Sequence, residues 1–369
     1  MRVICTGISG TGRLAWLRSV ADLARSRGLD VALFDVRETM FDIARAVGEP
    51  VEEETILDMF PRALVLLRAA ALEQICSAIE ADPSRHWILN THAVFRWKNT
   101  LISGFDPHYL TRLDPHLFVT FTRGIGDTLR SLRSQARWTH LEPEQVLTWR
   151  EEEQFFTEEM ARIHRKPQVL LPGGLPVEVG YRLFFEPRRV RAYLSYPMQH
   201  VAPDAERGLN AFRERLGQHV IVFDPADVND FGRAAPEGDQ SPSDGSAQLA
   251  ALRDSEAPRV RRDPVEQHIA DQIVERDYKL IAQSDVVVVF YDVPVPSPGV
   301  ISEMKFALES GKRVYGVWLP SSEPSVFFTR YCSLWFRDTE TLFAQLLPDL
   351  QASAEQRAAV AVGKPEPLA

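Results

Sequence analysis

The stretch that most constrains the fold is an uninterrupted apolar run at 286–290, VVVVF, which lies between Asp285 and Asp292. A strand that is apolar on both faces indicates a parallel sheet covered by helices on both sides. Prolines and a glycine within 294–299 end this strand and precede a helix. Ligands of parallel sheets bind beyond the carboxyl ends of the strands, where a helix N-terminus suits an anion. We therefore expect an anion-binding crevice here, faced by Glu303 from the first turn of the helix.

The same stretch resembles the nucleoside 2-deoxyribosyltransferase superfamily, in which a strand, a loop and a helix-borne glutamate nucleophile follow one another. The segment 297–300, SPGV, followed by Glu303 is most similar to the 2'-deoxynucleoside 5'-phosphate N-hydrolases. Their S-x-G-V-x-x-E segment holds a 5'-phosphate and supplies the nucleophile. The resemblance implies that Glu303 is the nucleophile. It also implies that Ser297, Gly299 and Val300 bind the phosphate of the substrate.

Two further positions carry this resemblance. Asp277, in the segment RDYKLI, matches the second carboxylate of the family, which implies that it positions the sugar or handles the proton. Tyr193, at the end of the first strand of this domain, is expected to orient the nucleotide through its hydroxyl. The sequence departs from the family at Tyr196 and Gln199, where the hydrolases carry a glycine and an arginine.

The chain opens with MRVICTGISGTGR, a short strand that runs into a glycine-rich turn and then a helical pattern. This order is what a phosphate-binding P-loop requires, because backbone N–H groups must converge at a helix start. Arg13 stands where the pattern has lysine, and Leu14 stands where it has Ser or Thr, which leaves no magnesium ligand there. The candidate phosphate-binding residues of this loop are Gly7, Ser9, Gly10, Thr11, Gly12 and Arg13.

Further along, Asn90-Thr91-His92 follows a strand, LDPH precedes the next strand, and Arg123, Arg130 and Arg133 come after it. With the P-loop-like start, this order resembles the archaeal type of adenylate kinase over about residues 1–165. The resemblance implies phosphate contacts from the three arginines, although they equally fit a solvated basic helix face. Asn90 replaces the aspartate that would assist the metal. We expect nucleotide binding without efficient phosphoryl transfer.

These patterns predict an α/β chain of two domains, each a parallel sheet covered by helices. The first resembles a P-loop kinase and the second the flavodoxin-like or Rossmann-like deoxyribosyltransferase fold. The expected boundaries are 1–165 for the kinase-like domain, 166–189 for a linker, 190–350 for the deoxyribosyltransferase-like domain with a mobile insertion near 232–263, and 351–369 for a tail.

Composition narrows the class of protein further. The 51 acidic residues outnumber the 42 basic ones, which argues against a nucleic-acid partner. There is no apolar run of transmembrane length and no signal peptide, so we expect a cytoplasmic protein without a membrane partner. Cys5, Cys76 and Cys332 are far apart, and the histidines lack ligand spacing, so no disulfide framework and no metal site is predicted. Relatives of this fold commonly assemble, which implies a homo-oligomer.

The leading hypothesis is an enzyme, a nucleotide N-glycosidase of nucleotide metabolism. It would cleave the base from a (deoxy)ribonucleoside 5'-monophosphate through Glu303, either as a hydrolase or as a deoxyribosyltransferase. That reaction needs no cofactor. ATP or another nucleotide, with magnesium, is the ligand expected at the N-terminal domain. The alternatives are a nucleoside monophosphate kinase of the adenylate kinase type and a non-catalytic nucleotide sensor.

Overall fold

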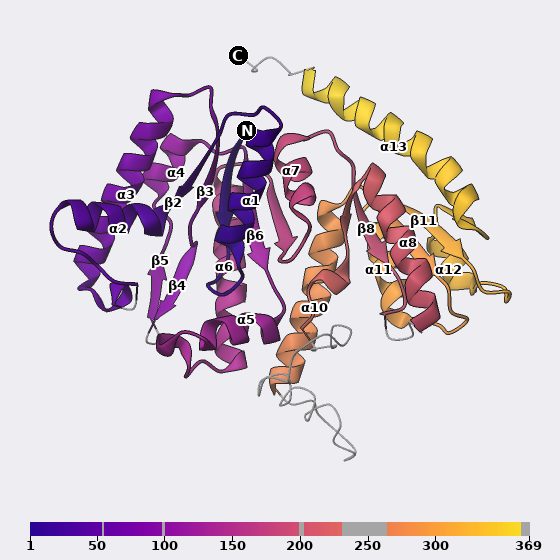
Figure 1. Cartoon of the computed structure of the whole chain (residues 1–369). Helices are drawn as coiled ribbons and strands as arrows, with labels where there is room; N and C mark the ends of the chain where they lie inside the picture. Colours follow the sequence, from indigo (N-terminus) through magenta and orange to yellow (C-terminus); the bar gives the residue numbers. More distant parts are fainter. Residues whose placement is uncertain (54, 98–99, 199–202, 231–263, 363–369) are drawn as a thin grey trace. The chain divides into compact units, whose positions relative to one another are not determined.

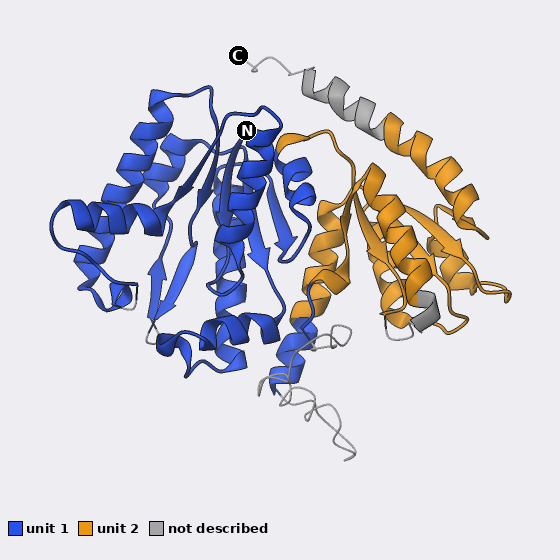
Figure 2. Cartoon of the chain, viewed as in Figure 1, with its two compact units in different colours: residues 1–184, 228–271 blue, residues 185–227, 272–369 orange. Residues whose placement is uncertain are grey.

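The computed structural model describes residues 1–53, 55–97, 100–198, 203–230 and 264–362. The chain divides into two compact units (Figure 2), residues 1–184 with 228–271, and residues 185–227 with 272–369. Each unit is built around a five-stranded sheet in which every strand pair is parallel. The predicted α/β fold class with two covered parallel sheets is confirmed.

The sheet of the first unit includes β2, β3 and β6, which are labelled in Figure 1. Its strands are β1 (Arg2–Thr6), β2 (Val31–Asp35), β3 (His86–Asn90), β6 (Leu117–Thr122) and β7 (Gln168–Pro172), with a separate antiparallel hairpin of β4 (Val94–Trp97) and β5 (Thr100–Ser103). Its helices are α1 (Arg13–Ser26), α2 (Val36–Ala46), η1 (Ile56–Asp58), α3 (Pro61–Ala81), α4 (Pro107–Leu113), α5 (Ile125–Arg133), η2 (Ala136–Trp138), α6 (Pro143–Ile163) and α7 (Val177–Phe185).

The strand order in this unit is β2-β3-β1-β6-β7. Both faces of the sheet are covered, as its apolar strands require. Helices α3, α4 and α6 contribute to a buried cluster with Ile4 of β1 and Phe118 of β6. Helix α1 packs against β2 and β3 on the sheet and buries Leu17 and Val20. Because β2, β3 and β1 are adjacent and parallel, their carboxyl ends lie side by side at the same end of the sheet.

The segment 166–189, predicted as a linker, belongs largely to this unit, so that boundary is wrong. It contributes β7, which pairs with β6, and helix α7. The short apolar run of β7 is buried from Val169 to Pro172. Its proline and the glycines that follow disguised it in the sequence, because Pro and Gly usually mark irregular structure.

The second unit is organised around β10, the predicted apolar strand. Its strands are β8 (Arg191–Ser195), β9 (Ile221–Phe223), β10 (Val286–Tyr291), β11 (Arg313–Trp318) and β12 (Leu334–Phe336). Its helices are α8 (Pro203–His219), η4 (Pro225–Asp227), α10 (Pro264–Gln283, of which 272–283 fall in this unit), α11 (Pro298–Glu309), α12 (Val326–Tyr331) and α13 (Thr339–Val362). The strand order is β9-β8-β10-β11-β12.

Strand β10 is buried along its whole length, and its two faces pack against different helices. Val286, Val288 and Phe290 pack into one cluster with helices α8 and α13. The alternate residues point to the opposite face, toward α11. The insertion predicted near 232–263 lies outside the described residues, and the predicted tail begins inside α13.

Packing of α7 against α1 gives a test of the first unit. A Cβ added to Gly180 of α7 would lie 2.2 Å from the ring of Trp16 and 2.8 Å from Val20. Gly180→Ala is therefore expected to lower the free energy of unfolding by about 1–3 kcal/mol, as overpacking does. Gly126→Ala in α5 is the matched control, since its Cβ would meet no described atom within 4 Å. Equal stability of the two variants in denaturant titrations would contradict this packing.

Candidate functional site

In the second unit, Glu303 projects from α11 toward the end of β8. Helix α11 begins at Pro298 because the Ser297 side chain caps it, accepting from the backbone N–H of Val300. Glu303 is therefore in the second turn, and the expectation of a first-turn position is wrong. The Ser195 hydroxyl, at the carboxyl end of β8, donates to Glu303 Oε2 at 2.5 Å. The Glu303 carboxyl, on the helix that follows β10, thus contacts the carboxyl end of the neighbouring strand β8.

Burial sets the protonation of this carboxyl. Removal from water and the negative charge of Asp277 raise the pKa of Glu303 to about 8, although Ser195 and Tyr193 oppose the shift. The Tyr193 hydroxyl is buried and has no hydrogen bond of ordinary geometry among the described residues, yet it lies close enough to Glu303 to lower that pKa. Burial and Glu303 raise the pKa of Tyr193 well above its ordinary value. The site is a pair of carboxyls beside two hydroxyls, in which Glu303 is half-buried and Asp277 is buried.

Asp277 is almost fully buried in α10 and forms an ion pair with its neighbour Arg276, whose guanidinium Nη2 lies 3.0 Å from Oδ1. Arg276 is also buried, and its charge lowers the pKa of Glu303. The structure therefore brings together Glu303, Asp277 and Tyr193, three residues that sequence reasoning had selected. It adds Ser195 and Arg276, which that reasoning did not single out.

The start of α11 is open enough for a ligand. Gly299 is exposed, and a Cβ placed on it would meet only Ser297 Oγ, at 4.0 Å. Neither packing nor a left-handed backbone therefore requires glycine at this position. A glycine where the backbone must approach a ligand closely is a recognised use of the residue. Val300, the third predicted phosphate-binding residue, is buried, and its backbone N–H already donates to Ser297 Oγ.

Tyr196, which stands at the position of the family glycine, is part of a polar network beside β8. Its hydroxyl donates to Asp224 at 2.9 Å, and Arg213 Nε donates to the same carboxylate at 2.6 Å. Asp224 is buried at the end of β9. Burial, and then the charge of Asp224, raise the pKa of Asp227 to about 7. The carboxyls of Asp224 and Asp227 are thus close together and largely removed from water after the end of β9.

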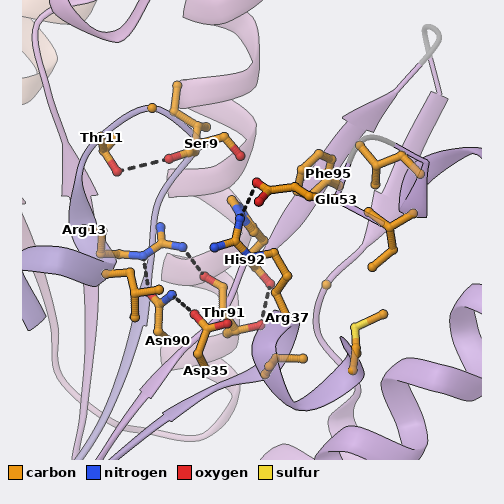
Figure 3. A pocket seen from close by; sticks show the side chains of 18 of the residues that line it. Ser9, Thr11, Arg13, Asp35, Arg37, Glu53, Asn90, Thr91, His92 and Phe95 are labelled. Atoms are coloured by element: carbon orange, nitrogen blue, oxygen red, sulfur yellow. Dashed lines mark hydrogen bonds and ion pairs between the residues drawn. The ribbon is translucent and has the colours of Figure 1, made fainter. Parts of the chain in front are cut away.

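In the first unit, a cavity of about 260 Å³ lies beyond the carboxyl ends of β1, β2 and β3 (Figure 3). The loop before α1 forms one wall, with Ser9, Gly10, Thr11 and Gly12 among the lining residues. Gly10 and Gly12 have φ angles of 83° and 74°, which a side chain would strain. The loop has the shape that anion binding at a helix start requires.

Arg13 lines the cavity, but its guanidinium is held by acceptors of the protein itself. Its guanidinium donates to the side-chain oxygen of Asn90 and to the carbonyl oxygens of Gly7 and Thr91, the last at 2.8 Å. The Asn90 amide donates in turn to Asp35 at 2.5 Å (Figure 3). Burial lowers the pKa of Arg13. A phosphate would have to share this cation with three protein acceptors.

These residues do not fit a magnesium-nucleotide centre. Asn90 uses its side-chain oxygen for Arg13 and its amide for Asp35, and Leu14 has no ligand atom. Among the described residues, no group of three or more His, Cys, Asp or Glu could hold a metal ion.

Of the predicted arginines after β6, Arg123 lies near the glycine loop, where its Nη1 would be 3.9 Å from a Cβ placed on Gly12. The described residues that line the cavity do not include Arg123, Arg130 or Arg133. Arg123 and Arg130 form ion pairs with Asp127 on α5, and Arg133 donates to the carbonyl oxygen of Leu141. Their arrangement matches the alternative of a charged helix surface.

Other arginines line the cavity instead, and no motif or spacing in the sequence indicated them. Arg37 comes from α2, Arg68 from α3 and Arg137 from η2, three elements far apart in the chain. Burial lowers the pKa of Arg68, which donates to the carbonyl of Ser103. Apolar residues such as Met40 complete the lining. The cavity therefore combines cationic and apolar surface.

A buried carboxylate holds the loops around this cavity. Glu153 of α6 is 1% exposed and accepts from the backbone N–H groups of Gly7, Ala93 and Val94 at 2.8–2.9 Å. Burial alone would raise its pKa, but His92, Arg13 and the backbone donor of Val94 lower it below its ordinary value. An ionised Glu153 thus fixes the start of the glycine loop to the segment that follows β3.

Comparisons with known proteins leave the function open. No protein-family model matches the chain, and no curated protein does. A crystal structure of a conserved protein from Enterococcus faecalis V583 is 17% identical, covering 46% of this chain and 99% of that chain, with a TM-score of 0.23. A likeness at that TM-score carries no argument. In the described part of the chain, no helix is long and apolar enough to cross a membrane.

The raised pKa of Glu303 predicts a pH-dependent stability. Between about pH 4.5 and pH 8 the unfolded chain ionises this carboxyl and the folded chain does not, so stability falls as pH rises through that window. The free energy of unfolding of Glu303→Gln is expected to be about 1–3 kcal/mol higher than that of the wild type at pH 8. Near pH 4.5 the two proteins should be equally stable. Glu309→Gln, at the exposed end of α11, is the control in denaturant titrations. The same difference from the wild type at both pH values would contradict the assignment.

Proposed function

We propose that the second unit is a nucleotide N-glycosidase that cleaves the bond between base and sugar in a (deoxy)ribonucleoside 5'-monophosphate. One observation carries the proposal: the Glu303 carboxyl lies at the end of β8, bonded to Ser195 and shielded beside Asp277. In open α/β sheets this is where substrates bind, because β8 is the strand from which the order reverses.

The chemistry follows from the placement of the two carboxyls. The ionised Glu303 carboxylate forms a bond to the anomeric carbon as the bond from that carbon to the base nitrogen breaks. The base leaves with the electron pair and takes up a proton. Water, or a second base, then attacks the same carbon and releases Glu303. Asp277, ionised beside Arg276, orients the sugar or handles the proton by passing one from water to the leaving base, and its ion pair with Arg276 holds it in place.

The start of α11 supports the choice of a 5'-monophosphate. Ser297, the backbone of Gly299 and the helix dipole offer donors and positive potential to a phosphate group. The charged phosphate would then anchor the sugar at a fixed distance from Glu303. Fixing a reacting carbon in this way lowers the entropic part of the barrier.

The reaction is tested by incubating the purified chain with ribo- and deoxyribonucleoside monophosphates, with and without Mg-ATP. Chromatography follows free base and nucleoside diphosphate. We expect free base, and we expect Glu303→Ala to reduce its release by about 10³-fold or more, while Glu309→Ala leaves it unchanged. Diphosphate without free base would instead support the nucleoside monophosphate kinase. Binding without either product would support the nucleotide sensor.

The pH profile separates two roles for Glu303. A nucleophile must be ionised, and its pKa in the free protein is about 8. We therefore expect kcat/KM to rise with pH and to level off above about pH 8. A decline above pH 8 would contradict the nucleophile and assign Glu303 as a general acid.

Gly299 tests the phosphate site without disturbing the fold. Since a Cβ at this position meets nothing closer than 4.0 Å, Gly299→Ala is expected to leave thermal stability nearly unchanged. It should raise KM for a nucleoside 5'-monophosphate by about tenfold, a loss of about 1.4 kcal/mol. Cleavage of the corresponding nucleoside, which lacks the phosphate, serves as the comparison. An equal change in KM for the nucleoside 5'-monophosphate and for the nucleoside would mean that the phosphate does not bind at Gly299.

A further inference from the structure

The cavity of the first unit contains a carboxylate clamped between two arginines. Arg37 Nη1 lies 2.6 Å from Glu53 Oε1, and Arg137 Nη2 lies 3.0 Å from the same oxygen. All three residues line the cavity, and Arg37 and Glu53 are labelled in Figure 3. Two guanidinium groups that converge on one oxygen form an anion site, and Glu53 now supplies the anion.

The members of this clamp differ in exposure to solvent. The Arg137 side chain is 13% exposed, whereas those of Arg37 and Glu53 are 46% and 42% exposed. Arg137 is held further by Gln135 and by the backbone carbonyl of Glu53. The Glu53 side chain can thus turn into solvent while the guanidinium of Arg137 stays in place. Exposed ion pairs are weak and screened by salt, so another anion can displace this carboxylate.

A separate observation shows that Arg137 is incompletely satisfied. Its Nε atom is buried and has no hydrogen-bond partner among the described residues. Buried guanidinium donors are normally paired, because leaving one unpaired is unfavourable. A ligand with several acceptor oxygens satisfies more donors than one carboxylate oxygen does.

The other walls of the cavity define the rest of the ligand. Met40, Ile56, Leu64 and Phe95 provide apolar lining opposite the glycine loop. Apolar walls with a few convergent polar groups are typical of small-molecule sites. A phosphomonoester carries nearly two negative charges and three acceptor oxygens, which suits two arginines better than a single carboxylate does.

We propose that this cavity binds a phosphomonoester that carries an apolar group, and that Glu53 occupies the anion position between Arg37 and Arg137 until the ligand displaces it. Glu53 is then an internal competitor that lowers the apparent affinity by the fraction of molecules in which it fills the clamp. The proposal is independent of the glycosidase chemistry of the second unit.

Equilibrium dialysis of the full chain with radiolabelled adenosine 5'-monophosphate, without added metal, tests this proposal. Every variant carries Glu303→Gln as well, so that turnover does not consume the probe and any binding in the second unit stays constant. Glu53→Gln removes the competing charge and keeps the side-chain length. Glu52→Gln is the matched control, since it removes an equal charge one residue away and Glu52 is exposed and is not among the lining residues.

We expect Glu53→Gln to tighten binding by about tenfold and Glu52→Gln to change it by less than about twofold. Arg37→Gln should weaken binding by at least about tenfold, while Arg45→Gln, on the exposed side of the same helix, should not. Inorganic phosphate should compete with the probe only weakly, because it lacks the apolar group.

Equal affinities of the Glu53→Gln and Glu52→Gln variants would overturn the competitor role. Binding of adenosine as tight as that of its monophosphate would overturn the phosphate class. Arg137→Gln should also weaken binding, but its buried side chain makes unfolding a possible outcome, so the exposed Arg37 carries the test. These binding results do not depend on the glycosidase activity. If the chain releases no free base from nucleoside monophosphates, the expected affinities at this cavity stay the same.

Discussion

The parallel pairing of β8 with β10 is the constraint on which the second unit depends. Strand β9 lies on the other side of β8, so the chain leaves these neighbouring strands toward opposite faces of the sheet. Helix α8 packs on one face, with Val286 and Phe290, and α11 follows β10 on the other. The ends of the two strands are thereby left uncovered by their own helices, and Glu303 and Ser195 meet there. The cost of placing a carboxyl beside Asp277 in this desolvated position is the raised pKa of Glu303.

In the first unit the candidate site also lies at the carboxyl ends of neighbouring parallel strands, but the residues there have different chemistry. The ends of β1 and β3 again lie side by side, and the glycine loop before α1 opens onto a cavity. There, however, the position expected for a catalytic cation is filled by Arg13, which is held by Asn90 and two carbonyl groups. The glycine loop and the cavity are therefore present, while the polar groups beside them satisfy one another.

Much of the fold could be predicted from the sequence, because apolar runs and glycine turns are local signals. The run at 286–290 became β10, and the strand, loop and helix order placed Glu303 beside Tyr193. Strand β7 escaped notice because proline and glycine follow its short apolar core.

The cavity arginines escaped for another reason. Arg37 and Arg137 lie a hundred residues apart and meet only through Glu53. No spacing along the chain encodes such a contact. The orientation of Arg13 was equally hidden, since its neighbours Asn90 and Thr91 follow a different strand. Sequence patterns thus located both sites, while the tertiary fold decided which polar groups remain open to a ligand.

The central claim is that Glu303 attacks the anomeric carbon of a nucleotide. Rapid quenching of the protein during turnover, followed by proteolysis and mass measurement, tests it most directly. We predict that the peptide containing Glu303 gains the mass of the sugar phosphate and that the Glu303→Gln protein gains none. Release of free base with the added mass on another residue would contradict the account.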